Sequence, residues 1–117
     1  METSLLLKYF LPSEFLEHFD LVKIKEQEQE ETLCIHLEEK NVLPEEHSDK
    51  PLESKGFGPV TTIQDFPIRD KRVLLKVRCR KWRDKLTGKT YSRSWDLSAN
   101  GTNYTKEFAA FLKEFVR

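Results

Sequence analysis

The segment RVLLKVRCRKWR at Arg72–Arg83 sets the fold expected for this chain, because it alternates with a period of two. Apolar residues hold the odd positions from Val73 to Cys79, and basic residues hold most of the even positions. Successive side chains of a strand point to opposite sides of a sheet, so the pattern predicts one apolar and one basic face. Leu74 interrupts the basic face and Trp82 ends it.

A second strand is expected to return beside this one. Asp84–Lys89 has the composition of a turn, with Gly88 as the residue at positive φ, and Thr90–Leu97 follows as the return strand. A loop of two or four residues centred on Thr87-Gly88 would pair positions whose numbers sum to about 175. A loop of three or five residues would turn Ser92 and Ser94 to the basic face instead. In the first register that face carries a set of cations and aromatics: Lys76, Arg78, Arg80, Trp82, Tyr91, Arg93 and Trp95.

The remaining periodicities predict an α+β fold. Short helices are expected at Ser4–Leu11 and from Ser13 onwards, followed by a β-hairpin over residues 21–38. Another strand follows Gly58-Pro59, so the sheet is expected to be antiparallel, with a basic β-hairpin at 72–97. Thr105 is a good N-cap for a final amphipathic helix. Its apolar face would hold four residues: Phe108, Phe111, Leu112 and Phe115.

Charge divides the chain into two halves of opposite sign. Residues 1–56 carry six Lys and fourteen Asp or Glu, whereas residues 57–117 carry fourteen Lys or Arg and six acids. We therefore expect an acidic helix-hairpin lobe at 1–39, a linker or long loop at 40–56 and a basic region at 57–117 that shares one core with the first. The asymmetry indicates either that one half binds an anion or that the two halves attract each other.

The basic charge is densest between Arg69 and Arg93, where eleven Lys or Arg face only two acids. Such a concentration, with aromatics between the cations, is typical of a surface that binds nucleic acid. The alternative is a solvated strand whose long side chains cover Trp82 and Trp95. The candidate nucleic-acid-binding residues are Arg72, Lys76, Arg78, Arg80, Trp82, Arg83, Lys85, Lys89, Tyr91, Arg93 and Trp95.

Several other classes of protein are not expected. Cys34 and Cys79 are far apart with no CxxC, and Cys34 with His36 offers only two metal ligands, so we expect reduced thiols and no metal or other cofactor. The residues form no nucleophile arrangement and no glycine-rich phosphate loop, so neither an enzyme nor a small-molecule substrate is expected. The apolar segments are too short to span a membrane, and the Leu5–Leu7 cluster does not form a signal peptide, which favours a cytoplasmic protein.

Several motifs resemble the N-terminal region of insertion-sequence transposases, in particular the small ISAon-family N-terminal region protein. The main ones are TTIQDFP at Thr61–Pro67, KRVLLKV at Lys71–Val77 and RKWR at Arg80–Arg83. Shorter matching elements cover most of the chain: Leu37–Asn41, Leu43-Pro44, Ser54–Phe57, Thr87–Lys89, Ser92-Arg93 and Phe108–Glu114. The related region of ISL-type transposases resembles a zinc ribbon, whose cysteines are absent here: Asp84 stands where one would follow Trp82-Arg83.

The resemblance implies double-stranded DNA as the partner, specifically the ends of an insertion element. It also implies that catalysis would come from a separate DDE transposase protein, because this chain is too short to hold that core. The first hypothesis is therefore a noncatalytic DNA-binding module. The alternative is an adaptor that assembles with the catalytic protein through its acidic lobe or its final helix, and RNA binding is a third possibility.

Overall fold

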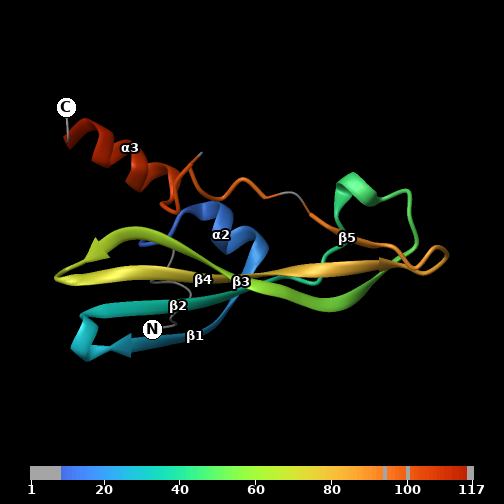
Figure 1. Ribbon diagram of the computed structural model, residues 1–117, viewed down its shortest axis with the longest axis horizontal. Helices are drawn as coiled ribbons and strands as arrows, with labels where there is room; N and C mark the ends of the chain where they lie inside the picture. The colour runs from blue at the N-terminus through green and yellow to red at the C-terminus, as the bar shows by residue number, and fades with distance from the viewer. Residues whose placement is uncertain (1–8, 94, 100, 116–117) are drawn as a thin grey trace.

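The computed structural model describes residues 9–93, 95–99 and 101–115 (Figure 1). The chain forms an α+β fold, as expected. Its strands belong to one mixed sheet. The strands are β1 (Phe19–Gln27), β2 (Thr32–Glu39), β3 (Leu52–Ile68), β4 (Lys71–Asp84) and β5 (Thr90–Ser92). The helices are α2 (Ser13–His18), α3 (Lys106–Phe115) and two 3₁₀ turns, η1 (Glu28–Glu30) and η2 (Glu45–His47). The helix expected at Ser4–Leu11 lies mostly outside the described residues.

The strand order β1-β2-β4-β3 brings the acidic and basic halves into one sheet, with β5 pairing β4 beyond the end of β2. The pairing of β2 with β4 is parallel, whereas the sequence predicted an antiparallel sheet. The reason is the segment after β2, which crosses over so that β3 returns antiparallel on the other side of β4. The loop expected at 40–56 is also shorter, because β3 already begins at Leu52.

One hydrophobic core joins the two halves of the sequence. Phe15 of α2 and Leu37 of β2 are fully buried together with Leu75 of β4. Burying a side chain of this size contributes roughly 1.5–3 kcal/mol. The remaining buried members of the core are Leu11, Phe19, Ile35, Ile63, Val73, Val77 and Leu97.

The buried side of β4 reverses along the strand. In its first half the odd-numbered residues from Val73 to Val77 are buried, as the alternation predicted. In its second half Trp82 and Asp84 are buried while Arg83 is exposed. The partner strand β3 contains irregularities between Ser54 and Val60, and bulges of this kind increase the local twist of a sheet. We attribute the reversal to this twist.

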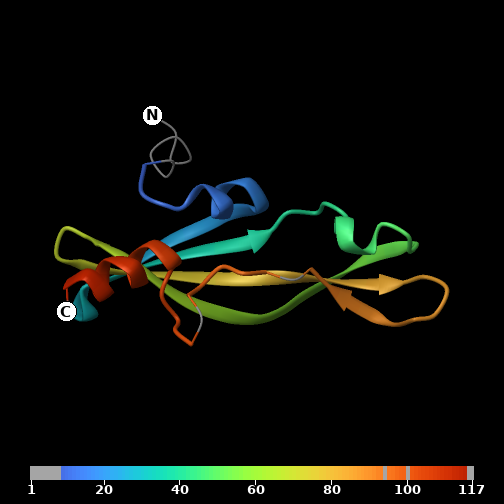
Figure 2. The same cartoon turned by 90° about the horizontal axis from the view of Figure 1, so that it is seen from above.

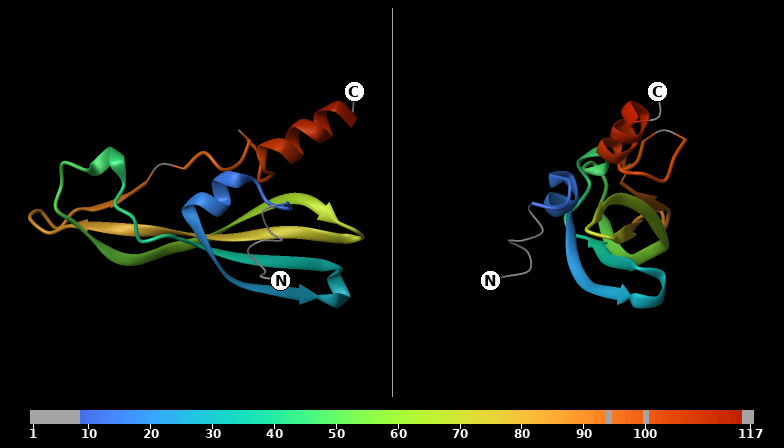
Figure 3. Two further views of the ribbon diagram at one scale, coloured as in Figure 1. Left: turned by 180° about the vertical axis from the view of Figure 1, so that it is seen from behind. Right: turned by 90° about the vertical axis from the view of Figure 1, so that its left-hand side faces the viewer.

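The reversal leaves the covering segments on one side of the molecule. In Figure 1, α2, α3 and η2 all lie above β4, and we call this the lid side. The first half of β4 packs its odd residues toward α2, and the second half turns its even residues toward the η2 segment. Residues exposed in both halves therefore point away from the lid side. The end-on view in Figure 3 shows β1 and β2 below β4, with α3 above it.

The molecule is elongated, measuring 50 × 36 × 25 Å, and the β4–β5 hairpin projects at one end (Figure 2). Its register pairs Trp82 with Tyr91 and Arg83 with Thr90, so the numbers sum to 173 rather than 175. A shift of two residues preserves the predicted parity, so that Trp82 and Tyr91 still share one side of the hairpin. The return strand is also shorter than the expected Thr90–Leu97, because β5 ends at Ser92.

Asp84 explains the observed register of the hairpin. Its carboxylate accepts hydrogen bonds from the N–H groups of Leu86 (2.8 Å) and Thr87 (3.3 Å), which fixes the four-residue loop. The hydrogen bond from Leu86 is the main reason that the pKa of Asp84 lies below its usual value. Gly88 closes the loop at φ 76°, the positive φ that the sequence predicted.

Thr105 caps α3, as expected, and also connects this helix to β3. Its Oγ1 accepts a hydrogen bond from the Phe108 N–H at 3.3 Å and donates one to the buried Asp65 carboxylate at 2.8 Å. Burial raises the pKa of Asp65, although hydrogen bonds from the Phe66 N–H and from Thr105 oppose this shift. Phe108 packs against Phe66 with ring centroids 5.1 Å apart.

Thr105→Ala should destabilise the protein by about 1–2 kcal/mol, because it removes the cap and leaves the Asp65 carboxylate with one donor fewer. Urea denaturation would measure the change in the free energy of unfolding. Thr90→Ala, at an exposed position of β5, is the control and should change it by no more than about 0.5 kcal/mol. Equal effects of the two substitutions would contradict this role of Thr105.

Candidate functional site

The residues predicted to form one basic face are separated into three groups by the reversal of β4. Arg72, Lys76 and Arg78 lie on the exposed side of its first half. Arg83, with Lys85 and Lys89 of the following loop, lies at the hairpin end. The other five predicted residues are Arg80, Trp82, Tyr91, Arg93 and Trp95, and they lie at least partly buried.

The first group belongs to an open surface that crosses four strands. Lys76 lies directly between His36 of β2 and Thr62 of β3, and Lys23 of β1 is the next residue beyond His36. The neighbouring row across the strands contains Lys25, Cys34, Leu74 and Gln64. We call this surface the outer face and define it by Lys23, Lys25, His36, Arg72, Lys76 and Arg78.

Few of the cations on the outer face are neutralised. Arg78 pairs with Glu38 at 2.9 Å, and Asp20 stands opposite Glu38 at the same end of the face. Lys76 donates a hydrogen bond to the Thr62 hydroxyl at 3.0 Å, which positions its ammonium group without removing its charge. Lys23 and Lys25 are exposed and take part in none of the ion pairs formed by the described residues.

His36 reports the positive potential of this face. Burial lowers the pKa of His36, and the charges of Lys23, Lys76 and Lys25 lower it further. These charges therefore favour the neutral form of the imidazole. A shallow groove of about 260 Å³ runs beside it, lined in part by Lys23, His36, Val60, Lys76 and Arg78.

Lys23, Lys25 and His36 were not among the predicted site residues. The sequence assigned them to the acidic half, where the lysines alternate with apolar residues on a hairpin. Only the parallel pairing of β2 with β4 brings His36 beside Lys76, and no local signal in the sequence indicates that pairing.

A second basic surface covers the hairpin end, and we call it the hairpin surface: Lys81, Arg83, Lys85 and Lys89. All four side chains are exposed. Arg83 pairs with Glu53 across the strands, its Nε donating to a carboxylate oxygen at 3.0 Å. The three lysines take part in none of the ion pairs among the described residues.

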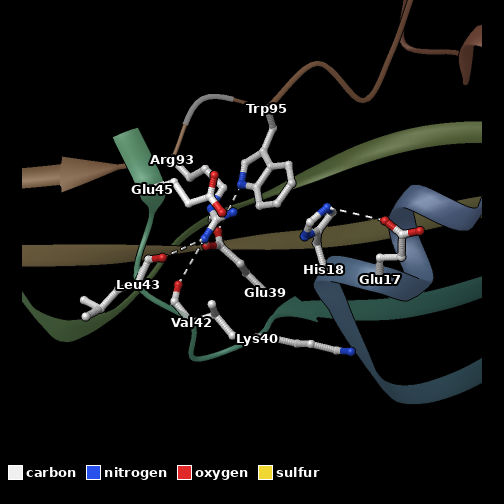
Figure 4. Close-up of a pocket in the computed structure, with 9 residues that line it drawn as sticks. All are labelled: Glu17, His18, Glu39, Lys40, Val42, Leu43, Glu45, Arg93 and Trp95. Atoms are coloured by element: carbon white, nitrogen blue, oxygen red, sulfur yellow. Dashed lines mark hydrogen bonds and ion pairs between the residues drawn. The ribbon is translucent and has the colours of Figure 1, made fainter. Parts of the chain in front are cut away.

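A buried carboxylate, that of Glu39, contacts three of the predicted residues. Glu39 is 2% exposed, and its Oε1 accepts hydrogen bonds from the Arg80 N–H and the Trp95 indole N–H, both at 3.0 Å. The Arg80 guanidinium donates to the Glu39 carbonyl oxygen, and Arg93 Nε lies 3.8 Å from Glu39 Oε2. Arg93 and Trp95 therefore do not lie on an open basic face, contrary to the prediction (Figure 4). We call Glu39, Arg80, Arg93 and Trp95 the Glu39 cluster. The Arg80 guanidinium, by contrast, lies with that of Arg78 against the Phe57 ring, 4.6 and 4.8 Å from its centre.

Trp82 and Tyr91 are also not on an open face, contrary to the prediction. Trp82 is 2% exposed, and Tyr91 packs against His47 of η2 with ring centroids 4.8 Å apart. The ammonium group of Lys50 lies 5.1 Å from the centre of the Tyr91 ring. These aromatic rings stabilise the lid over the second half of β4, so they are not placed to stack on exposed bases.

The attraction between the two halves of the sequence, the alternative to anion binding, is visible in the structure. Arg78 pairs with Glu38, Arg83 with Glu53 and Arg93 with Glu39, and each pair joins the basic half to the acidic half. These ion pairs neutralise part of the basic charge. The lysines of the outer face and the hairpin surface take part in none of the ion pairs among the described residues.

Little in the described residues indicates metal or thiolate chemistry. They contain no group of three or more His, Cys, Asp or Glu side chains that could hold a metal ion. Burial and the nearby Glu39 charge raise the pKa of Cys79 to about 11, so this thiol is protonated at neutral pH. None of the described helices is long and apolar enough to cross a membrane.

Comparison with protein-family models, with curated proteins and with solved structures gave no match. We therefore infer a function from the geometry of the outer face, the hairpin surface and the Glu39 cluster.

Glu39→Ala should destabilise the protein by about 3–5 kcal/mol, because it leaves Arg93 and two N–H donors without their buried partner. Glu53→Ala removes a carboxylate from the half-exposed pair with Arg83 and should cost at most about 1 kcal/mol. Chemical denaturation of the two variants measures the difference. If the two variants lost the same free energy of unfolding, the contacts of Glu39 would not be the main stabilising link between the two halves of the sequence.

Proposed function

We propose that this chain is a noncatalytic DNA-binding module that contacts the phosphate backbone with its outer face and hairpin surface. The observation that carries the proposal is the group of Lys23, Lys25 and Lys76 around His36 on an open four-stranded face. Like charges gathered in this way repel one another. A polyanion relieves that repulsion and releases its own counterions on binding.

The size of the molecule suits a duplex. Its long axis measures 50 Å, and B-form DNA rises 3.4 Å per base pair, so the chain could lie along about 15 base pairs. The hairpin surface continues the exposed side of β4 beyond the outer face. Lysines in both places can therefore approach phosphates along one side of the molecule.

The placement of the aromatic residues favours duplex DNA over single strands. Proteins that bind single-stranded DNA or RNA usually stack exposed bases on aromatic side chains. Here Trp82, Tyr91 and Trp95 are at least partly buried, and the Phe57 ring beside the outer face is flanked by the guanidinium groups of Arg78 and Arg80. Contacts to the phosphate backbone position a protein without reading sequence.

The biological setting of the proposal comes from the motifs that resemble insertion-sequence transposases. In that setting the DNA would be the ends of the element, and a separate DDE transposase protein would supply strand transfer. Preference for element ends would then come from that partner or from the shape of the DNA, because the outer face is suited to backbone contacts.

Replacing Lys23, Lys25 and Lys76 together by Gln should weaken binding to a fluorescent duplex. Each phosphate contact contributes about −0.9 to the slope of log K against log salt, so losing three should make the slope about 2.7 less steep. Fluorescence anisotropy over a salt series measures both quantities. Lys40, Lys50 and Lys106 replaced by Gln form the matched control, which removes the same charge from other positions.

The control should bind the duplex much more tightly than the outer-face variant. Equal losses in the two triple variants would mean that net charge alone matters and would contradict the outer face as the site. If the natural chain bound no duplex at low salt, the proposal would be wrong. Co-purification with a separate catalytic transposase would then test the adaptor alternative.

DNA affinity should also rise as the pH falls, because of His36. A bound phosphate backbone favours the imidazolium, so the pKa of His36 is higher in the complex than in the free protein. Affinity therefore increases as the pH falls through the bound-state pKa. It levels off below the free-state pKa, which lies under the usual value of 6.5.

Anisotropy titrations across this pH range would measure the effect. The charged groups around His36 are Lys23, Lys25 and Lys76, with the carboxylates of Glu38 and Asp20 at the end of the face. His36→Gln should remove the pH dependence. A pH dependence unchanged in this variant would contradict the assignment.

A further inference from the structure

The turn between β4 and β5 carries the most exposed large apolar side chain among the described residues. This is Leu86, which is 84% exposed and lies in the loop of the hairpin that projects from one end of the molecule (Figure 2). Its neighbours Lys85 and Lys89 are exposed as well, and they take part in none of the ion pairs formed by the described residues. The tip of the hairpin therefore presents one apolar side chain flanked by two cations.

Hydrogen bonds hold the backbone of this loop in one conformation. The Asp84 carboxylate accepts the Leu86 N–H, and the Asp84 N–H donates to the Lys89 carbonyl oxygen at 2.8 Å. The Lys85 N–H donates to the Pro51 carbonyl oxygen at 3.0 Å, which connects the loop to the segment before β3. Because the loop is already ordered, a partner that binds Leu86 does not have to order its backbone, and little conformational entropy is lost.

The charge at this end of the molecule favours a polyanion. The hairpin surface is basic, and the carboxylates at this end are engaged with protein groups. Asp84 is 6% exposed, Glu53 pairs with Arg83, and Asp49 pairs with Lys50 at 3.2 Å. A partner that suits the whole tip therefore combines negative charge with an apolar surface that can cover Leu86.

Duplex DNA meets both requirements when it is kinked. Proteins that bend DNA insert leucine and other apolar side chains between base pairs from the minor groove, while cations contact the phosphates. A lipid surface is the other polyanion with an apolar interior. A single leucine, however, buries less apolar area than a myristoyl chain, which alone gives only marginal membrane binding.

We propose that Leu86 inserts between two base pairs from the minor groove and kinks the duplex at the hairpin end of the molecule. Lys85 and Lys89 contact the phosphates beside the opened step. Burial of Leu86, which is otherwise in water, and these two contacts offset the cost of unstacking. This insertion rests on the DNA binding proposed above and adds a change in the shape of the DNA. It favours steps such as TA that unstack easily, which gives a preference for some sequences without hydrogen bonds to bases.

Energy transfer between dyes at the two ends of a duplex tests the insertion with the natural chain. The duplex has about 30 base pairs and a central TA step. Saturation with the natural chain should raise the energy transfer, because a kink brings the two ends closer together. With Leu86→Ser the transfer should stay at the value of free DNA. Anisotropy of the same duplex should show that this variant binds about tenfold more weakly, because one leucine is no longer buried. Its slope of log K against log salt should be unchanged, since Leu86 carries no charge.

Leu43→Ser is the matched control, because it removes the same side chain from an exposed position outside the hairpin. It should raise the energy transfer as the natural chain does, and so should Leu86→Met, which keeps an apolar side chain at the tip.

Two results would overturn the insertion and leave the proposed DNA binding in place. One is binding of the natural chain with no rise in energy transfer, and the other is an equal rise with Leu86→Ser. Absence of duplex binding by the natural chain would overturn both. Binding to phosphatidylserine vesicles that depends on Leu86, with no kink in the duplex, would overturn the insertion and identify the tip as a lipid-binding loop.

Discussion

The length of β4 imposes the constraint on which the other features depend. Fourteen residues in one strand extend beyond the single core formed with α2, so the second half needs another cover. The bulged β3 twists the sheet, and the even-numbered side of β4 then meets the η2 segment. A strand with one fixed apolar face would have left Trp82 in water. The same twist determines which cations are exposed. It turns both Lys76, at an even-numbered position, and Lys81, at an odd-numbered one, away from the lid side.

Glu39 links the acidic and basic halves of the sequence. It does so where the buried residues of β4 change from odd-numbered to even-numbered positions. Its carboxylate accepts hydrogen bonds from the backbone N–H of Arg80 and the indole N–H of Trp95, and it forms an ion pair with the guanidinium of Arg93. A charged carboxylate buried to this extent is stable only when hydrogen-bond donors surround it. Arg80, Arg93 and Trp95 supply these donors. The lysines that remain outside this cluster, chiefly Lys23, Lys25 and Lys76, are the ones available to a polyanion.

Local patterns predicted much of the fold. The strand at Arg72–Arg83 with its alternation from Val73 to Val77, the Thr105 cap and the positive φ of Gly88 each reflect short-range chemistry, and the structure confirms them. The alternation could not predict the reversal after Cys79, because twist depends on bulges in a partner strand. The parallel pairing that places His36 beside Lys76 joins residues forty positions apart, and the sequence carries no local trace of it. The candidate site was therefore predicted only in part, through Arg72, Lys76, Arg78 and the hairpin lysines.

The sorting of arginines by the twist of β4 can be measured directly with an arginine-specific reagent such as phenylglyoxal and mass spectrometry. The account predicts rapid modification of Arg72 and Arg83, which are exposed on opposite parities of the strand. It predicts protection of Arg80 and Arg93, which the Glu39 cluster holds. Modification of all four arginines at the same rate would contradict the account, because it would mean that they share one open face.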